Sequence, residues 1–91
     1  MDQKIKNFKE LNVWKKAIEI VKDTYFLSQS FPQKETFGLS QQMQKCSVSI
    51  ASNIAEGFNR FHNKEFIQFL YISLGSCAEL ETQLEIAFVL H

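Results

Sequence analysis

The chain has 91 residues, zero formal net charge, and 45% hydrophobic residues that include nine Phe. This length fits one domain, residues 1–91, and excludes a second. The hydrophobic content also excludes intrinsic disorder. Because a lone domain of this size buries only about 64% of its unfolded surface, so much apolar surface indicates self-association.

The Cys and His content limits the chemistry of the chain. Cys46 and Cys77 cannot form a disulfide scaffold, and we expect free buried thiols. His62 and His91 add too few ligands to predict a zinc site. The charged N-terminus lacks a signal-peptide pattern, and no apolar run reaches the ~18 residues that span a membrane. The sequence therefore predicts a cytoplasmic protein with no metal, no cofactor and no membrane partner.

The first predicted helix covers about residues 11–28. Its apolar residues recur at steps of three and four, which is typical of one helix face. They form two adjacent rows, Leu11, Trp14, Ile18, Val21 and Tyr25 beside Val13, Ala17, Ile20 and Leu27. Together the rows span about 200° of the helix, so one neighbouring helix cannot cover them.

The second predicted helix covers about residues 39–56 and buries one apolar stripe. The stripe consists of Leu39, Met43, Cys46, Ile50 and Ile54. We expect Gly57 to end this helix, because Gly adopts the left-handed conformation of a helix C-terminus without steric cost.

The third predicted helix covers about residues 63–90, with Asn63 as its N-cap. Apolar residues lie on nearly all of its sides, which indicates burial by several neighbours. The apolar pattern continues to Leu90 without Gly or Pro, so we expect a fourth helix, either truncated from this chain or supplied by a partner. The predicted fold class is an all-α, antiparallel up-and-down helical bundle.

Several sequence blocks point to a known family. They are LNVW at 11–14, Phe31-Pro32, SIASNIAEG at 49–57, KEFIQFL at 64–70 and LGSCAELETQL at 74–84. In this order they resemble the four-helix-bundle proteins encoded in intervening sequences of bacterial 23S rRNA genes. The resemblance implies an up-and-down bundle that forms a homopentamer. It also implies a relationship to the accessory variability protein of diversity-generating retroelements, which binds nucleic acid and a reverse transcriptase.

Polar residues within the apolar stripes predict an internal polar network. Asn53 projects into the stripe of the second helix, and Glu81 lies at the edge of the apolar side of the third. Buried amides and carboxylates need hydrogen-bond partners, and single polar groups of this kind fix helix register. We therefore assign Asn53 and Glu81, with Gly57, a structural role. The candidate partners of Glu81 are Lys45, Arg60 and Asn53.

Catalytic patterns are missing from the sequence. Di-iron bundles need Glu-x-x-His pairs, and no acidic residue here has a His three positions later. No glycine-rich phosphate-binding loop occurs in the sequence. Neither His has a neighbouring Ser or Cys in the pattern of a catalytic nucleophile and its base. We predict no catalytic residue and no enzyme, although a site formed between subunits stays open as an alternative.

Charge is segregated along the chain. Residues 1–22 contain six Lys against three acids, whereas residues 65–91 contain four acids and no Lys or Arg. Candidate nucleic-acid-binding residues are Lys15, Lys16, Lys22, Lys45, Arg60 and Lys64. The alternative for the first helix is an ordinary solvated face, because Glu19 and Asp23 lie among its lysines. Phe58, Phe61 and Arg60 are residue types that stack bases, although Phe at the end of a bundle is more often core.

These patterns predict a non-enzymatic oligomeric bundle that binds RNA, DNA or a nucleic-acid-processing protein through lysine-bearing faces. Repetition of a weak basic patch around an assembly would strengthen its contact with phosphates. The alternative is a purely structural or protein-interaction oligomer without nucleic-acid binding.

Overall fold

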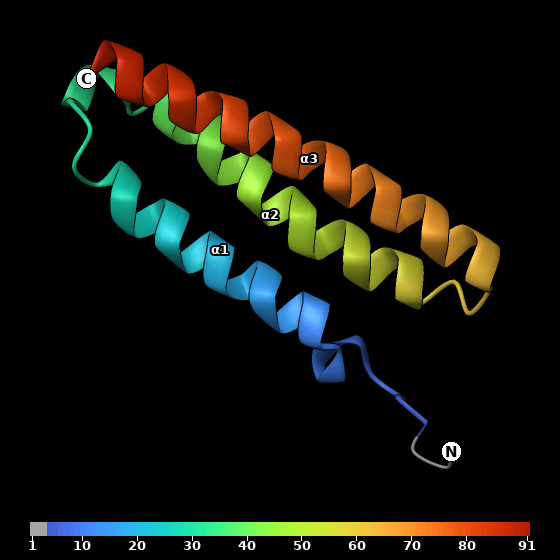
Figure 1. Cartoon of the computed structure of the whole chain (residues 1–91). Coiled ribbons are helices and arrows are strands. Elements are labelled where there is room, and N and C mark those ends of the chain that lie inside the picture. The colour runs from blue at the N-terminus through green and yellow to red at the C-terminus, as the bar shows by residue number, and fades with distance from the viewer. Residues whose placement is uncertain (1–3) are drawn as a thin grey trace.

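A computed structural model describes residues 4–91 and consists of three long helices (Figure 1). The long helices are α1 (Asn12–Ser28), α2 (Leu39–Phe58) and α3 (Asn63–Leu90). Two short 3-10 turns, η1 (Phe8–Glu10) and η2 (Gln33–Glu35), precede α1 and α2. The all-helical prediction is confirmed, and the bounds of α1 and α3 agree with it to within one residue.

The helices form an open layer with α2 in the middle (Figure 1). α1 packs on one side of α2 and α3 on the other, and within residues 4–91 the backbones of α1 and α3 do not contact each other. The molecule is elongated, with extents of 49 × 20 × 18 Å and a radius of gyration of 14.9 Å. A compact domain of this length would have a radius of about 12 Å. The sides of α1 and α3 that face away from α2 are therefore uncovered.

The core follows the stripe predicted on the second helix. Met43, Cys46, Ile50 and Ile54 are all buried, as predicted. They meet Ala17 of α1 and two residues of α3, Leu80 and Ala87. The small side chains of Ala17 and Ala87 let α2 approach both neighbours closely at these two positions.

Hydrogen bonds join α2 to α3 along a row of small polar side chains. Ser73 Oγ donates to Ile50 O at 2.9 Å, and the Cys46 thiol donates to Ser76 O at 3.1 Å. Ser49 Oγ and Ser76 Oγ are 3.1 Å apart. These bonds satisfy hydroxyl and thiol groups that would otherwise be costly to bury.

Gly57 differs from its predicted role. It lies inside α2, which continues to Phe58, and it does not have a positive φ. A Cβ at this position would lie 2.5 Å from Phe69 Cβ, so Gly57 is needed for the close approach of α3. Among the described residues, the non-Gly residue with positive φ is Phe61, at 61° in the α2–α3 connection.

Asn63 also differs from its predicted role. It is the first residue of α3, and His62 occupies the N-cap without a side-chain cap bond. The carbonyl of His62 accepts the first helical bond from Phe66 N at 2.9 Å. The extended backbone of His62 therefore starts the helix.

Two glycines provide a matched test of helix packing. We expect Gly57→Ala to destabilise the fold by about 1 to 3 kcal/mol, because its methyl group collides with Phe69. Gly75→Ala in α3 adds a methyl group that meets nothing within 4 Å and should stabilise the fold by about 0.5 to 1 kcal/mol. Thermal melting of both variants checks the opposite signs. Equal shifts in the same direction would contradict this packing.

None of the helices formed by residues 4–91 combines the length and the apolar character needed to cross a membrane. This finding agrees with the absence of a membrane-spanning run in the sequence.

Candidate interaction surfaces

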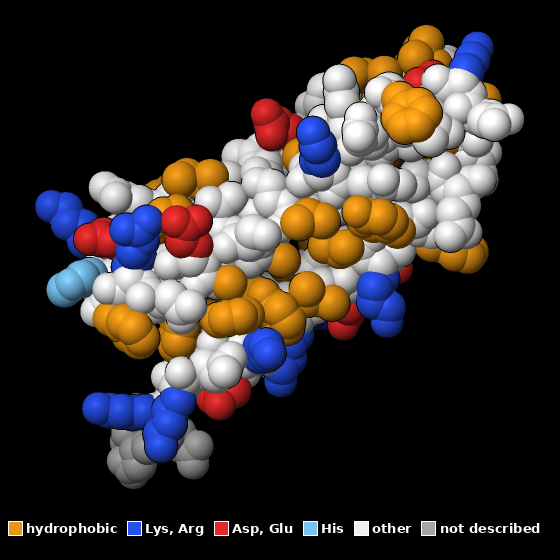
Figure 2. All heavy atoms as spheres, turned by 180° about the vertical axis from the view of Figure 1, so that it is seen from behind, with side chains coloured by type: hydrophobic (Ala, Val, Ile, Leu, Met, Phe, Trp, Pro, Cys, Tyr) orange, Lys and Arg blue, Asp and Glu red, His pale blue; other side chains and the backbone are white. Residues whose placement is uncertain are grey.

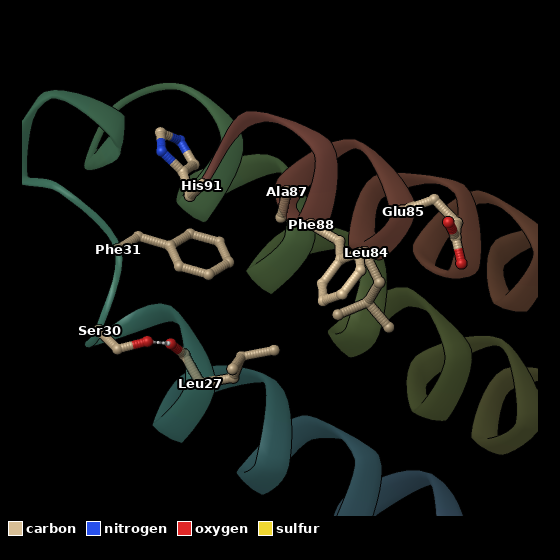
Figure 3. A pocket seen from close by; sticks show the side chains of 8 residues that line it. All are labelled: Leu27, Ser30, Phe31, Leu84, Glu85, Ala87, Phe88 and His91. Carbon is tan, nitrogen blue, oxygen red and sulfur yellow. Dashed lines mark hydrogen bonds between the residues drawn. The ribbon is translucent and has the colours of Figure 1, made fainter.

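A groove separates α1 from α3 near the η2 end of the molecule (Figure 3). Its volume is about 510 Å³. Leu27 of α1 and Phe31 of the connection face Leu84 and Phe88 of α3 across it (Figure 3). We call this hollow the α1–α3 groove. It is open because α1 and α3 each pack against α2 and, within residues 4–91, their backbones do not contact each other.

His91 and Glu35 close one end of the α1–α3 groove. His91 Nε2 lies 2.9 Å from Glu35 Oε2, and the His91 ring lies beside the Phe31 ring at a tilt of 33°, with centroids 6.1 Å apart. Because an ionised carboxylate only accepts hydrogen bonds, Nε2 is the donor. Glu35 Oε1 accepts from Leu39 N at 3.3 Å, which caps α2. The bonds from His91 and from Leu39 N hold the pKa of Glu35 below its ordinary value.

The lowered pKa of Glu35 predicts a pH-dependent contribution to stability. The fold favours ionised Glu35, so this contribution is present above the ordinary glutamate pKa and is lost as pH falls through the lowered pKa of the folded state. We expect Glu35→Gln to lower the melting temperature at neutral pH, and by less at an acid pH, where Glu35 becomes protonated. Melting curves at both pH values check this, and a difference of the same size in acid would contradict it.

α3 exposes a large apolar surface, because among the helices of residues 4–91 only α2 packs against it. We call it the α3 apolar surface; its members are Ile67, Tyr71, Ile72, Leu74, Leu84, Ile86, Phe88, Val89 and Leu90. Phe88 is 85% exposed and Val89 79%. The whole chain exposes 6721 Å², about 1,200 Å² more than a compact monomer of its mass.

The predicted basic residues of α1 and α2 lie at the surface. Lys15, Lys16, Lys22 and Lys45 are all exposed. Lys15 and Lys22 are seven residues apart and share one side of α1, whereas Lys16 lies about 100° away around the helix. Figure 2 shows basic side chains scattered over one face of the molecule, several of them beside acidic ones, with apolar patches between them. The three lysines of α1 therefore do not all lie on one line along the helix.

Arg60 and Lys64 lie at the α2–α3 connection. The Arg60 guanidinium is 3.0 Å from Glu56 and 3.9 Å from Glu65, and it lies over the Phe69 ring at 5.2 Å. These contacts compensate the charge of Arg60. Its position therefore favours a structural role, in which it holds the α2–α3 connection in place, over phosphate binding. Lys64 is exposed. Within residues 4–91 no lysine lies within ion-pair distance of an acid.

The predicted polar network is only partly formed. Asn53 is half-buried, and its amide donates to Ser49 O at 2.9 Å and to Ser49 Oγ at 3.0 Å. Through Ser49 and Ser76 it is linked to α3. Glu81 is exposed instead of internal, and Arg60 pairs with other acids. The reason is that α1 and α3 do not meet, so the side of α3 that carries Glu81 is not covered.

No group of three or more His, Cys, Asp or Glu side chains within residues 4–91 is arranged to hold a metal ion. Cys46 is buried and free, and Cys77 is half-buried and free. Burial raises the pKa of the Cys46 thiol, which disfavours the reactive thiolate.

Comparison with known protein families identifies the family of this chain. The 23S rRNA-intervening sequence protein family matches residues 9–91. The chain belongs to this family. No curated protein matches the sequence. Membership in the 23S rRNA-intervening sequence protein family confirms the resemblance carried by the blocks from LNVW to LGSCAELETQL.

Two features were not predicted from the sequence. The α1–α3 groove depends on the spacing of helices, which periodicity does not report. A second hollow, of about 500 Å³, lies between residues 4–6 and the α2–α3 connection. The N-terminal segment has no periodic pattern, so nothing in the sequence places it beside Phe58 and Phe61.

Proposed function

We propose that the protein is a non-enzymatic helical module that self-associates through the α3 apolar surface and binds RNA or DNA through exposed lysines. The observation that carries the proposal is the uncovered α3 apolar surface, with Phe88 85% exposed. Large exposed apolar surfaces on soluble proteins often mark sites of protein–protein contact. The excess surface of about 1,200 Å² exceeds the roughly 800 Å² per partner of a standard interface.

Charge supports a particular arrangement of the copies. Residues 4–28 carry six Lys against three acids, whereas residues 65–91 carry four acids and no Lys or Arg. Contact between α3 of one copy and α1 of the next pairs opposite charges, whereas two α3 helices would repel. Such a head-to-tail contact repeats from copy to copy and can close a ring. The resemblance described above implies five copies.

Nucleic-acid binding is supported by the same charge segregation. Exposed Lys15, Lys16 and Lys22 recur in every copy, so an assembly multiplies contacts that are weak in one chain. A purely structural oligomer is the rival function, favoured by the acidic residues among these lysines.

Fluorescence anisotropy at two salt concentrations tests the binding half of the proposal. With duplex DNA, single-stranded DNA and RNA as probes, we expect affinity that falls steeply as salt rises. No binding to any of the three at low salt would overturn nucleic-acid binding and leave the structural oligomer.

A further inference from the structure

The hollow at the α2–α3 connection combines aromatic rings with lysines. Phe58, Phe61 and Phe66 line one side, and Lys4, Ile5 and Lys6 line the other. We call it the Phe61 hollow. The N-terminal segment is held there by contacts of η1. The Phe8 and Trp14 rings pack edge to face with their centroids 5.4 Å apart. Asn7 Oδ1 accepts a hydrogen bond from Lys9 N at 2.8 Å.

Phe61 presents its ring to solvent instead of to the core. The side chain is 78% exposed, and the backbone has a φ of 61°, which is uncommon for a non-Gly residue. The Phe58 ring packs against the Phe61 ring at a centroid distance of 6.3 Å. On its other side it packs against the Phe66 ring at a centroid distance of 5.9 Å. The three aromatic residues therefore hold one ring at the outer edge of the bundle, where a face is free for stacking.

The charge around this ring suits an anionic ligand. Lys4 and Lys6 line the hollow, and the described lining residues include no Asp or Glu. Of the nearby acids, Glu56 and Glu65 pair with Arg60, and Glu10 accepts from the backbone of Lys6 at 3.4 Å. An exposed aromatic face beside two cations complements a nucleobase followed by its phosphates.

We propose that the Phe61 hollow binds single-stranded nucleic acid, with one nucleobase stacked on Phe61 and adjacent phosphates against Lys4 and Lys6. This rests on the nucleic-acid binding proposed above and adds the strand state and the site. A base in a duplex keeps both faces stacked on its neighbours, so only an unpaired strand offers a face to Phe61.

Three variants of the full chain test the site by fluorescence anisotropy. The probes are eight-nucleotide oligo(U), oligo(dT) and an abasic strand of equal length. We expect Phe61→Asn, which tolerates positive φ, to weaken both base-bearing probes about tenfold and to leave the abasic probe unchanged. Phe61→Tyr keeps an aromatic face and should bind as wild type does. Lys4→Ala with Lys6→Ala should reduce the salt slope by about 1.4 for every probe.

The outcomes separate this inference from the proposed function. If wild type binds neither base-bearing nor abasic strands nor duplex, nucleic-acid binding fails and the Phe61 hollow fails with it. If wild type binds the strands and Phe61→Asn binds each of them with the affinity of wild type, base stacking on Phe61 is wrong while nucleic-acid binding stands. Equal weakening of all three probes would likewise exclude stacking.

Discussion

Leu74→Glu combined with Phe88→Glu is expected to convert the assembly into monomers. The two side chains are 63% and 85% exposed in the single chain, so their replacement changes monomer stability little. In the proposed interface, each substitution removes a large apolar contact and buries a carboxylate. Apolar anchors at the centre of an interface contribute about 2 kcal/mol or more each, so the pair should weaken association at least about 1,000-fold.

The control for this variant adds the same charge at polar, exposed positions. Gln33→Glu with Gln68→Glu changes net charge equally but removes no apolar side chain. Light scattering of both variants, with circular dichroism to verify helix content, gives the comparison. An unchanged mass for Leu74→Glu/Phe88→Glu would mean that the α3 apolar surface does not hold the copies together.

Replacing Lys15, Lys16 and Lys22 by Gln is expected to produce the largest loss of nucleic-acid affinity. Each lysine that contacts a phosphate of a duplex contributes about 0.9 to the slope of log affinity against log salt. Removal of three such contacts should lower the magnitude of the slope by about 3 per chain and the affinity at low salt by about 100-fold. All three side chains are exposed in the single chain, so the fold should not change.

A matched variant separates specific contacts from overall charge. Gln29→Glu, Gln33→Glu and Gln68→Glu together change net charge by the same amount at exposed positions outside the α1 lysines. We expect this variant to keep most of the affinity and nearly the full salt slope. Equal losses in the two variants would show that net charge, and not the lysines of α1, governs binding.

Much of the fold was predictable because local patterns determine it. The stripe of Met43, Ile50 and Ile54 has helical spacing, and those residues form the core. Gly57 and Phe61 show where this reasoning stops. The role of Gly57 depends on a close approach by Phe69, and the positive φ of Phe61 depends on how the connection closes; neither appears in helical periodicity.

The candidate surfaces were predictable only in part. The apolar sides of α3 indicate that several neighbours are needed, and the structure leaves most of those sides exposed. The predicted burial of Glu81 was wrong, because the apolar side of α3 next to it is itself exposed. Residues 4–6 lie beside the α2–α3 connection through the Phe8 and Trp14 contact, a tertiary interaction that no short motif encodes.

Multi-angle light scattering of the purified chain, over a range of concentrations, tests self-association most directly. The 10.6-kDa chain should elute as an assembly, with a mass of about 53 kDa for five copies. Stable particles of 10.6 kDa at every concentration would contradict the account, because the α3 apolar surface would then face water without a partner.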